Sequence, residues 1–132
     1  MVFTEFKNKL ANSIFLGSTT VALPIAYYLA LSTTEPTADG SNITEPPAGS
    51  GYTRIKMDKT LLTEPVNGVV SNVETIDYGE AASDWGEIIY AVFMDGTGTP
   101  CFASPMHSAV EVNTGDVFRI KAGNASFGFG GV

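Results

Sequence analysis

The sequence predicts a mainly β protein, an antiparallel β-sandwich or jelly-roll-like barrel preceded by one short N-terminal α-helix. Short runs rich in β-branched and aromatic residues recur along the chain, and turn pairs such as Asn67-Gly68 and Asp95-Gly96 separate them. No helical crossover pattern follows residue 17, which favours antiparallel pairing of the strands. With 132 residues, of which 44% are hydrophobic and 16% charged, residues 1–132 are predicted to form one domain around one core.

A short amphipathic helix is predicted over about residues 4–16. Its apolar residues recur at every fourth position, at Phe6, Leu10 and Ile14. Thr4 is placed to cap its first turn, and Gly17 is placed to end it. The apolar stripe suits packing on the protein's own sheet or on a partner, and we favour the protein's own core.

Seven strands are predicted from apolar runs and the turns that bound them. They span about residues 25–31, 52–57, 69–76, 88–94, 100–107, 116–122 and 125–129. The first strand follows Pro24 and is continuously apolar, which predicts burial, whereas the second alternates strictly between apolar and polar residues. The segment from Asp95 to Thr99 has a Gly-x-Gly pattern without a P-loop lysine or a following helix, so we interpret it as a hairpin turn.

A long loop of about residues 32–51 has neither helix nor strand periodicity. Loops longer than about 12–15 residues are uncommon in compact domains and usually carry function. This loop contains no His or Cys, which predicts a surface for contact and not for catalysis. Pro36, Pro46 and Pro47 restrict its conformations, so less entropy would be lost when it docks on a partner.

Charge and cysteine content exclude several classes of protein. The chain has 14 acidic and 7 basic residues, a net charge of −7, and no basic stripe, so we expect no nucleic-acid partner. Its single cysteine, Cys101, excludes an internal disulfide and a cysteine-based zinc site. The first 17 residues lack the continuous apolar core of a signal peptide, and the longest apolar run, Val21–Leu31, is too short to cross a bilayer. We therefore expect no membrane association.

Two groups of residues could carry catalysis. Strand alternation would place Cys101 and His107 on one face as a thiolate couple, but no motif surrounds them, and a buried Cys with a surface or interface His is favoured. Glu80, Asp84 and Glu87 lie close in sequence to Trp85, a pattern that could form a paired-acid hydrolase. Solvated acids around a buried Trp are favoured instead.

A metal site is the remaining chemical possibility. The segment Asp39–Asn42 could offer oxygen ligands to calcium, but it lacks the twelve-residue spacing of an EF-hand, and a turn is favoured. We therefore expect no metal, no cofactor and no enzyme activity.

The order and spacing of several segments resemble those of one protein family. These are the N-terminal helix ending near Leu16, Tyr28–Thr37, Glu45-Pro46, Gly51–Arg54, Asp84–Gly86 and Val112–Asp116. Over about residues 3–127 the chain resembles small virion structural proteins of tailed bacteriophages, whose members are labelled tail-fibre-like or head-decoration proteins. It departs from that pattern at Asp95–Met106, which is shorter and more irregular, and at Ser126–Val132, where Phe and Gly replace an apolar and polar alternation.

The resemblance implies a non-enzymatic virion protein with no catalytic residues. We expect a capsid decoration, or cement, protein, made in the host cytoplasm and located on the capsid surface, where it binds and stabilises the major capsid protein. A homo-oligomer is expected, with a trimer favoured. The alternative is a tail-fibre or receptor-binding module that recognises a host surface glycan, with Tyr52, Tyr78 and Trp85 as its candidate aromatic platforms.

Three segments are predicted to contact partners: the N-terminal residues, the long loop and the C-terminal tail. The candidate residues are Val2, Phe3, Phe6, Glu35, Pro36, Asp39, Asn42, Pro46, Pro47, Phe127, Phe129 and Val132. A rigid scaffold with extended appendages suits a protein that makes many identical weak contacts on an assembled shell.

Overall fold

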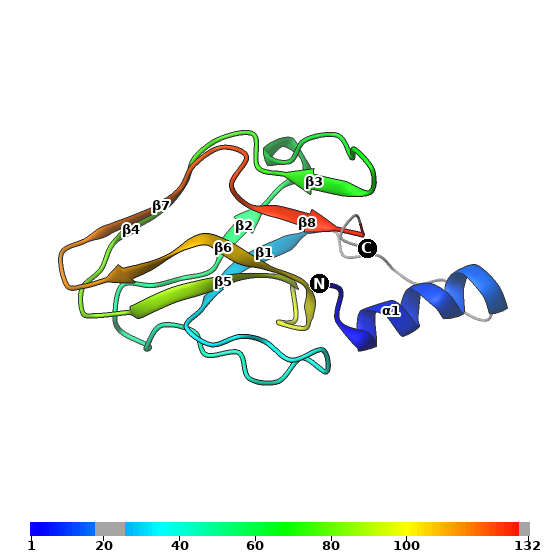
Figure 1. Cartoon of the computed structure of the whole chain (residues 1–132), viewed down its shortest axis with the longest axis horizontal. Helices are drawn as coiled ribbons and strands as arrows, with labels where there is room; N and C mark the ends of the chain where they lie inside the picture. The colour runs from blue at the N-terminus through cyan, green and yellow to red at the C-terminus, as the bar shows by residue number, and fades with distance from the viewer. Residues whose placement is uncertain (18–25, 130–132) are drawn as a thin grey trace.

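The computed structural model describes residues 1–17 and 26–129 (Figure 1). The predicted start of the first strand at residue 25 and the candidate Val132 lie outside the described residues. The helical elements are α1 (Thr4–Ala11), the π-helix η1 (Asn12–Leu16) and the 3₁₀ turn η2 (Lys59–Leu61). The strands are β1 (Tyr27–Ser32), β2 (Ile55–Met57), β3 (Val69–Ser71), β4 (Ile76–Glu80), β5 (Gly86–Asp95), β6 (Pro100–Val112), β7 (Val117–Ile120) and β8 (Ser126–Gly128).

The strands form three antiparallel sheets. The largest has four strands in the order β2-β1-β5-β6, and the two smaller sheets are the pairs β3-β8 and β4-β7. Figure 1 shows both small sheets on the same side of the large one. The mainly β, antiparallel fold with one short N-terminal helix is confirmed, and strand pairing within the described residues closes no barrel.

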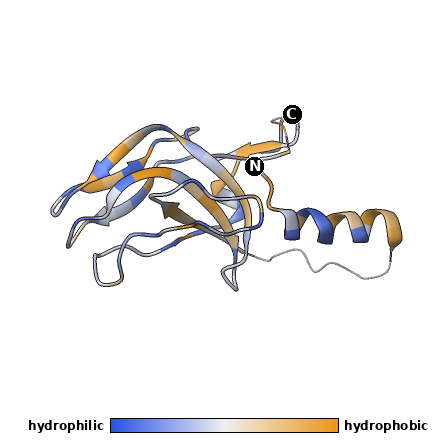
Figure 2. Cartoon of the chain, turned by 60° about the horizontal axis from the view of Figure 1, so that its bottom comes forward, coloured by the Kyte–Doolittle hydropathy of each residue, from blue (hydrophilic) through white to orange (hydrophobic). Residues whose placement is uncertain are grey.

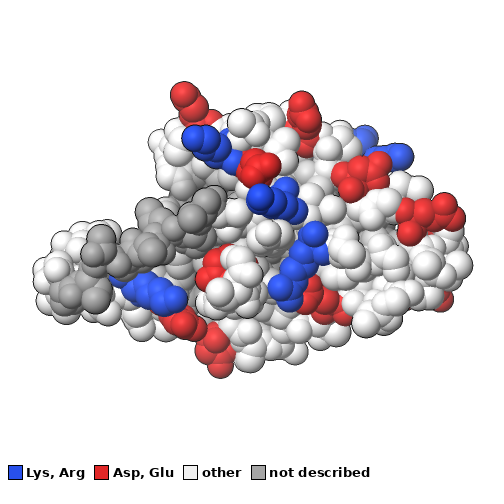
Figure 3. Space-filling model, turned by 180° about the vertical axis from the view of Figure 1, so that it is seen from behind, with Lys and Arg blue, Asp and Glu red and all other residues white. Residues whose placement is uncertain are grey.

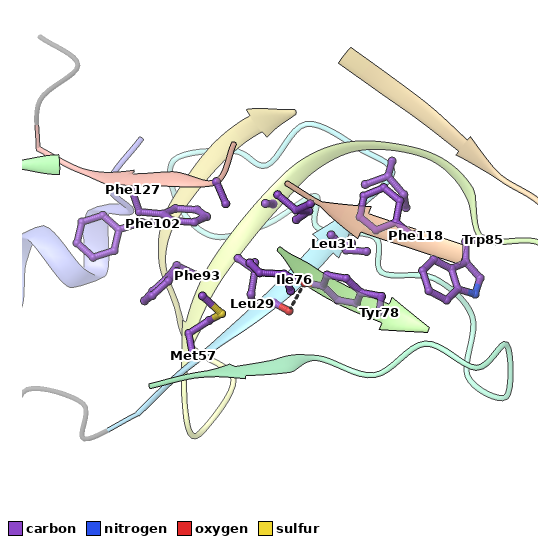
Figure 4. Close-up of a cluster of buried hydrophobic side chains, with 14 of the residues drawn as sticks. Leu29, Leu31, Met57, Ile76, Tyr78, Trp85, Phe93, Phe102, Phe118 and Phe127 are labelled. Atoms are coloured by element: carbon purple, nitrogen blue, oxygen red, sulfur yellow. Dashed lines mark hydrogen bonds between the residues drawn. The ribbon is translucent and has the colours of Figure 1, made fainter. Parts of the chain in front are cut away.

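The main core fills the space between the large sheet and the two small ones (Figure 4). Leu29 and Phe93 from the large sheet face Tyr78, Phe118 and Phe127 from the small ones, and all are buried. Each buried side chain of this size contributes about 1.5–3 kcal/mol by leaving water. This core accounts for the apolar residues on one face of the large sheet.

A second, smaller core covers the opposite face of the large sheet. Ala30, Val92 and Met94 point to this side and pack against Phe3 and the half-buried Ile43 of the long loop. A strand buried on both faces reads as a continuous apolar run and not as an alternating one. The apolar run of the first strand therefore has its explanation in the loop that covers it.

The N-terminal helical element spans Thr4–Leu16, but its first turn lacks the predicted side-chain cap and its last part is not α-helical. Thr4 makes no side-chain cap, and its backbone N–H instead donates to the Ala38 carbonyl of the long loop at 2.9 Å. The α-helix ends at Ala11 and continues as the π-helix η1. Gly17 ends the whole element in the left-handed conformation at φ 57°, and its N–H donates to the Asn12 carbonyl at 3.1 Å.

The predicted strand 69–76 is wrong, because this segment supplies β3 and β4, which belong to different sheets. Between them lies Asn72, which is buried. Its side-chain amide donates to the carbonyls of Glu74 and Lys121, and its Oδ1 accepts the Ala125 N–H at 3.0 Å. These bonds link three chain segments and prevent the backbone from continuing as one strand.

Strand β6 continues beyond the predicted end at His107 and contains a large bulge. From Ile88 to Tyr90 strand β5 advances by two residues, whereas its partner β6 advances by five, from Val110 to Pro105. The extra residues include the exposed His107 and Met106, which is half-buried against the main core. Such bulges bend a strand and break its alternation of faces.

Candidate interaction surface

The N-terminal residues, Ala38 of the long loop and Phe129 after β8 lie at one end of the protein (Figure 1). The last residues of the loop lie at the other end of the large sheet, where Gly51 approaches Glu80 and Ala82. The Met1 ammonium group donates to the Ala103 carbonyl at 3.0 Å, and the Ala103 N–H donates back to the Met1 carbonyl at 2.9 Å. The Phe3 N–H donates to the Cys101 carbonyl at 3.1 Å. The first three residues thus lie along the edge of β6, beside the loop that contacts Thr4.

One aromatic ring connects the N-terminal helix with the C-terminal strand. The Phe102 ring packs edge-on against Phe6 at a centroid distance of 5.2 Å and against Phe129 at 5.4 Å. Edge-to-face pairs at such distances stabilise by about 0.5–1.5 kcal/mol beyond their buried area. Helix α1 and Phe129, directly after β8, are therefore both held against Phe102.

The long loop is fixed to the domain by hydrogen bonds. The buried Ser32 hydroxyl accepts the N–H groups of Thr34 and Thr44 at 3.2 and 3.1 Å. Asn42 adopts a left-handed conformation at φ 60°, and its amide donates to the Glu35 carbonyl at 2.8 Å. The loop is thus ordered before any partner arrives, which lowers the entropy lost on binding.

The calcium candidate at Asp39–Asn42 is a self-contained turn. The Asp39 carboxylate accepts hydrogen bonds from the hydroxyls of Ser41 and Thr37 and from the Ser41 N–H. These donors lower the pKa of Asp39 to about 2. Within residues 1–17 and 26–129 no group of three metal-ligating side chains is present.

The end of the loop is tied to β1 and β2 through Glu45. Its carboxylate accepts two hydrogen bonds from Arg54, both at 2.8 Å, and one from the Tyr52 hydroxyl at 2.7 Å. The Tyr52 oxygen in turn accepts the Leu31 N–H at 3.1 Å. The Arg54 hydrogen bonds lower the pKa of Glu45, and burial raises the pKa of Tyr52. The network holds a charged pair in a bidentate geometry.

We expect the free energy of unfolding to depend less on pH in the Glu45→Gln variant than in the wild type. The folded protein holds the Glu45 pKa below its ordinary value of 4.5, so the ionised group stabilises the fold above that pH. This contribution is lost as pH falls through the lowered pKa. Urea unfolding of both proteins between pH 7 and pH 3 gives the difference between their free energies of unfolding. This difference should decrease as the pH falls. A constant difference would contradict the assignment, and Glu64→Gln, at an exposed position, serves as the control.

The structure separates the predicted contact residues by exposure. Glu35, Asp39, Asn42, Pro47 and Phe129 are exposed, and Val2 is half-buried. The remaining described candidates are buried: Phe3, Phe6, Pro36, Pro46 and Phe127. These buried side chains hold the fold together, so the exposed group is the part that a partner can reach.

A strongly exposed apolar patch lies at the far end of the N-terminal helix (Figure 2). Ile14, Phe15 and Leu16 are 72%, 81% and 70% exposed, and we call these three residues the apolar tip. The expected packing of the apolar stripe on the protein's own core is found for Phe6 but not for Ile14. Consecutive helical residues point about 100° apart, so three apolar residues in a row cannot all face one core. That run was the missed signal.

A groove that is lined by uncharged side chains and that no described residue fills lies on the same end of the domain, and we call it the apolar groove. Its volume is about 390 Å³. It is lined by Tyr27, Leu62, Pro65, Gly68, Val70, Phe93, Phe102, Phe127, Gly128 and Phe129. None of these residues is charged. Pockets that take apolar ligands or side chains have volumes from about 300 Å³ upward.

Cys101 and His107 do not form a couple. Cys101 is buried, and burial, with Asp95 nearby, raises the pKa of its thiol to about 11. His107 is exposed on the β6 bulge, so the expected alternation between the two residues is broken. The predicted buried Cys is confirmed, and the same-face geometry is wrong.

Comparison with known families assigns the chain. Residues 2–128 match the family described as Podophage GP4 fiber I protein gp80. The chain belongs to this family. The resemblance to small virion proteins of tailed bacteriophages is thereby confirmed, and the protein is a structural protein of a bacteriophage virion. None of the curated proteins matches the chain.

The aromatic platforms proposed for a glycan-binding member of this family are not on the surface. Trp85 is 2% exposed, Tyr78 is also buried, and Tyr52 is half-buried. Their rings pack against one another and against Phe118 (Figure 4). The Trp85 indole N–H donates to the Ser50 carbonyl at 2.8 Å. The prediction of a buried Trp is confirmed, and the platform prediction is wrong.

The acids around Trp85 have separate surroundings. Asp84 Oδ1 accepts the Thr114 N–H at 2.8 Å and its hydroxyl at 3.0 Å, which fixes the turn after β6. Glu80 and Glu87 are exposed. These positions fit solvated acids around a buried aromatic residue.

A shallow groove between β6 and β7 gathers basic side chains on this acidic protein. Its volume is about 200 Å³, and His107, Arg119 and Lys121 contribute to its lining. Arg119 Nε donates to Asp77 Oδ2 at 2.8 Å, which partly neutralises the local charge. Figure 3 shows that basic side chains are otherwise dispersed among acidic ones on the face it displays. In the part of the chain that the structure describes, no helix has the length and apolarity needed to cross a membrane.

Proposed function

We propose that this protein is a structural subunit of a virion fibre that works through protein contacts at the end carrying its N-terminal helix. The description of its family names a fibre protein. The observation that carries the proposal is the apolar tip, where three large side chains stand more than two-thirds exposed. Exposed apolar patches of this kind mark protein interaction sites. The function requires no catalysis.

The rest of this end is built to present contacts rigidly. The loop residues Glu35, Asp39 and Asn42 are exposed, while the backbone beneath them is held by the Ser32 and Glu45 hydrogen bonds. A pre-ordered surface loses little conformational entropy on docking. Repetition of such contacts in many copies of one virion protein multiplies weak individual affinities.

Capsid decoration is the rival assignment, with the major capsid protein as partner and a trimer as the predicted assembly. The two assignments differ in where the chain sits and in how many copies a particle carries. Gold-labelled antibody on intact particles, together with cryo-electron microscopy, measures both. We expect label confined to fibres and a few dozen copies per virion. Hundreds of copies spread over the head would instead establish decoration, and absence from purified particles would overturn both assignments.

Recognition of an acidic glycan is a second candidate function, favoured by the basic groove between β6 and β7. Cationic side chains attract carboxylate or phosphate groups on a host surface. We expect Lys121→Glu to lower adsorption of particles to host cells several-fold. Lys56→Glu changes an exposed lysine on β2 and should leave adsorption unchanged. Equal adsorption of the Lys121 variant and the wild type would remove this candidate.

A further inference from the structure

We infer that the apolar tip of one chain docks into the apolar groove of a second copy, so that copies associate head to tail. The inference rests on the proposed function only in taking this end of the molecule as its contact surface. Self-docking gives a partner both to the tip, which the described residues leave exposed, and to the groove, which they leave open. The partner is the protein itself.

The apolar tip is a projecting apolar surface with no charged residue. Figure 2 shows it at the end of the helix farthest from the β sheets. Among the described residues, the helix contacts the domain through the Thr4–Ala38 hydrogen bond, the buried Phe6 and the half-buried Leu10. Gly17 ends this element in a left-handed conformation. Ile14, Phe15 and Leu16 are therefore presented outward as one group.

The apolar groove is the matching feature. Aromatic rings of Phe93, Phe102 and Phe127 form its floor, and Phe129, which is 52% exposed, stands at its rim. Its volume of about 390 Å³ is in the range of pockets that take apolar groups. The β3-β8 pair supplies one wall, through Val70 and Gly128.

The helix directs the tip away from the domain (Figures 1 and 2), so the tip of the same chain does not fill the groove. Every copy carries both features at different places on its surface. Contacts between unlike patches of identical chains are heterologous, and they produce closed rings or filaments. Association between copies would cover the tip and fill the groove at the same time.

Charge around the two features is complementary. Helix α1 carries Lys7 and Lys9, with Glu5 within 3.9 Å of the Lys9 amine. Glu64 is exposed and does not line the groove, but it directly precedes the lining residue Pro65 in the sequence. A docked tip would bring the basic helix toward this acid. Such pairing steers association and sets its orientation more than it adds affinity.

The area of the contact predicts its strength. Three exposed side chains of this size offer roughly 400 Å² of apolar surface, from about 150–250 Å² for a fully buried aromatic residue. A standard stable interface buries about 800 Å² on each partner. One tip in one groove should therefore be weak, and a ring, in which each chain makes two contacts, should be stronger.

The test uses the purified full-length protein and two variants that each remove one half of the contact. Phe15→Asp damages the tip and leaves the groove, whereas Phe129→Asp damages the groove and leaves the tip. We expect the wild type to assemble with rising concentration in sedimentation velocity and each variant to remain monomeric. An equimolar mixture should form a complex of one chain of each variant, at a higher concentration than the wild type needs, because a single intact tip then meets a single intact groove. Val117→Asp, at an exposed apolar site on β7, should assemble like the wild type.

Several outcomes would overturn the inference. These are a wild type that stays monomeric at all concentrations, a Phe129 variant that still assembles through its tips, and a mixture that stays monomeric. Thermal unfolding checks each variant, and if Phe129→Asp is unstable, Pro65→Asp alters the groove at an exposed position. Gold labelling of virions tests the proposed function separately. Fibre labelling with a monomeric protein in solution would retain that function and reject the self-docking.

Discussion

Replacing Trp85 with alanine is expected to lower the free energy of unfolding by about 3–5 kcal/mol. The indole is 2% exposed and packs against Tyr52 and Phe118 at centroid distances of 5.6 and 6.4 Å. Alanine leaves a cavity at the centre of this cluster and removes the N–H that donates to the Ser50 carbonyl at 2.8 Å. Because small domains are stable by only about 5–15 kcal/mol, this loss would take much of the total.

The Trp85 measurement is urea unfolding followed by far-ultraviolet circular dichroism, since the variant lacks the protein's single tryptophan. Trp85→Phe is the matched control, because it keeps an aromatic ring and removes only the hydrogen bond and part of the volume. We expect it to cost less than the alanine variant. A loss below about 1 kcal/mol for alanine is typical of surface sites and would contradict the central place given to this residue.

Local features of the fold could be predicted from the sequence because they depend on neighbouring residues. The pair Asn67-Gly68 forms the expected tight turn, with both residues at positive φ, 53° and 78°. The flanking Val66 and Val69 exchange two backbone hydrogen bonds, at 2.9 and 3.0 Å. Such turns need residues that tolerate positive φ at both central positions, and Asn-Gly supplies them.

The role of the long loop could not be predicted in the same way. It covers the second face of the large sheet through Ile43, and its Ala38 carbonyl accepts the first N–H of the helix. These contacts join residues far apart in the chain, and the loop has no periodic pattern that would predict them. The same reason explains why Phe3 and Phe127 were predicted as partner contacts. Terminal aromatic residues look available in a sequence, whereas here they complete the two cores.

The apolar tip shows the opposite case, in which a local signal was present and was assigned to the wrong surface. Phe6, Leu10 and Ile14 are spaced four residues apart, which predicts that they share one face of a helix. The first two of them pack in or against the core. The α-helix gives way to the π-helix η1 after Ala11, which changes the direction of the later side chains. The helix also extends past the sheet edge, so Ile14 has no core residue to meet.

Gly51→Ala is expected to destabilise the protein by more than about 2 kcal/mol, because it combines a strained backbone with a steric clash. Gly51 has φ 85°, and a methyl group there would lie 2.9 Å from the Glu80 carbonyl oxygen and 3.1 Å from the Ala82 nitrogen. Both contacts are with backbone, which cannot rotate aside. The substitution would push the end of the loop away from the segment that follows β4.

Gly49→Ala provides the matched comparison. Gly49 has a similar positive φ of 79°, but no atom lies within 4 Å of a methyl group placed there. This variant should therefore show only the backbone cost, roughly 1 kcal/mol. The difference between the two unfolding free energies isolates the close approach of the loop to the domain.

Unfolding experiments give the total loss of stability, whereas hydrogen exchange shows which backbone N–H groups are affected. The Ala82 N–H donates to the Ser50 carbonyl at 2.8 Å, next to Gly51, so its exchange should accelerate in the Gly51 variant and stay slow in the Gly49 variant. Because the Ser50 carbonyl also accepts the indole N–H of Trp85, the same residue joins the loop to the aromatic cluster. Equal losses of stability in the two variants, with unchanged exchange at Ala82, would show that the loop is not seated against this segment. The link between the end of the loop and the aromatic cluster would then lose its physical basis.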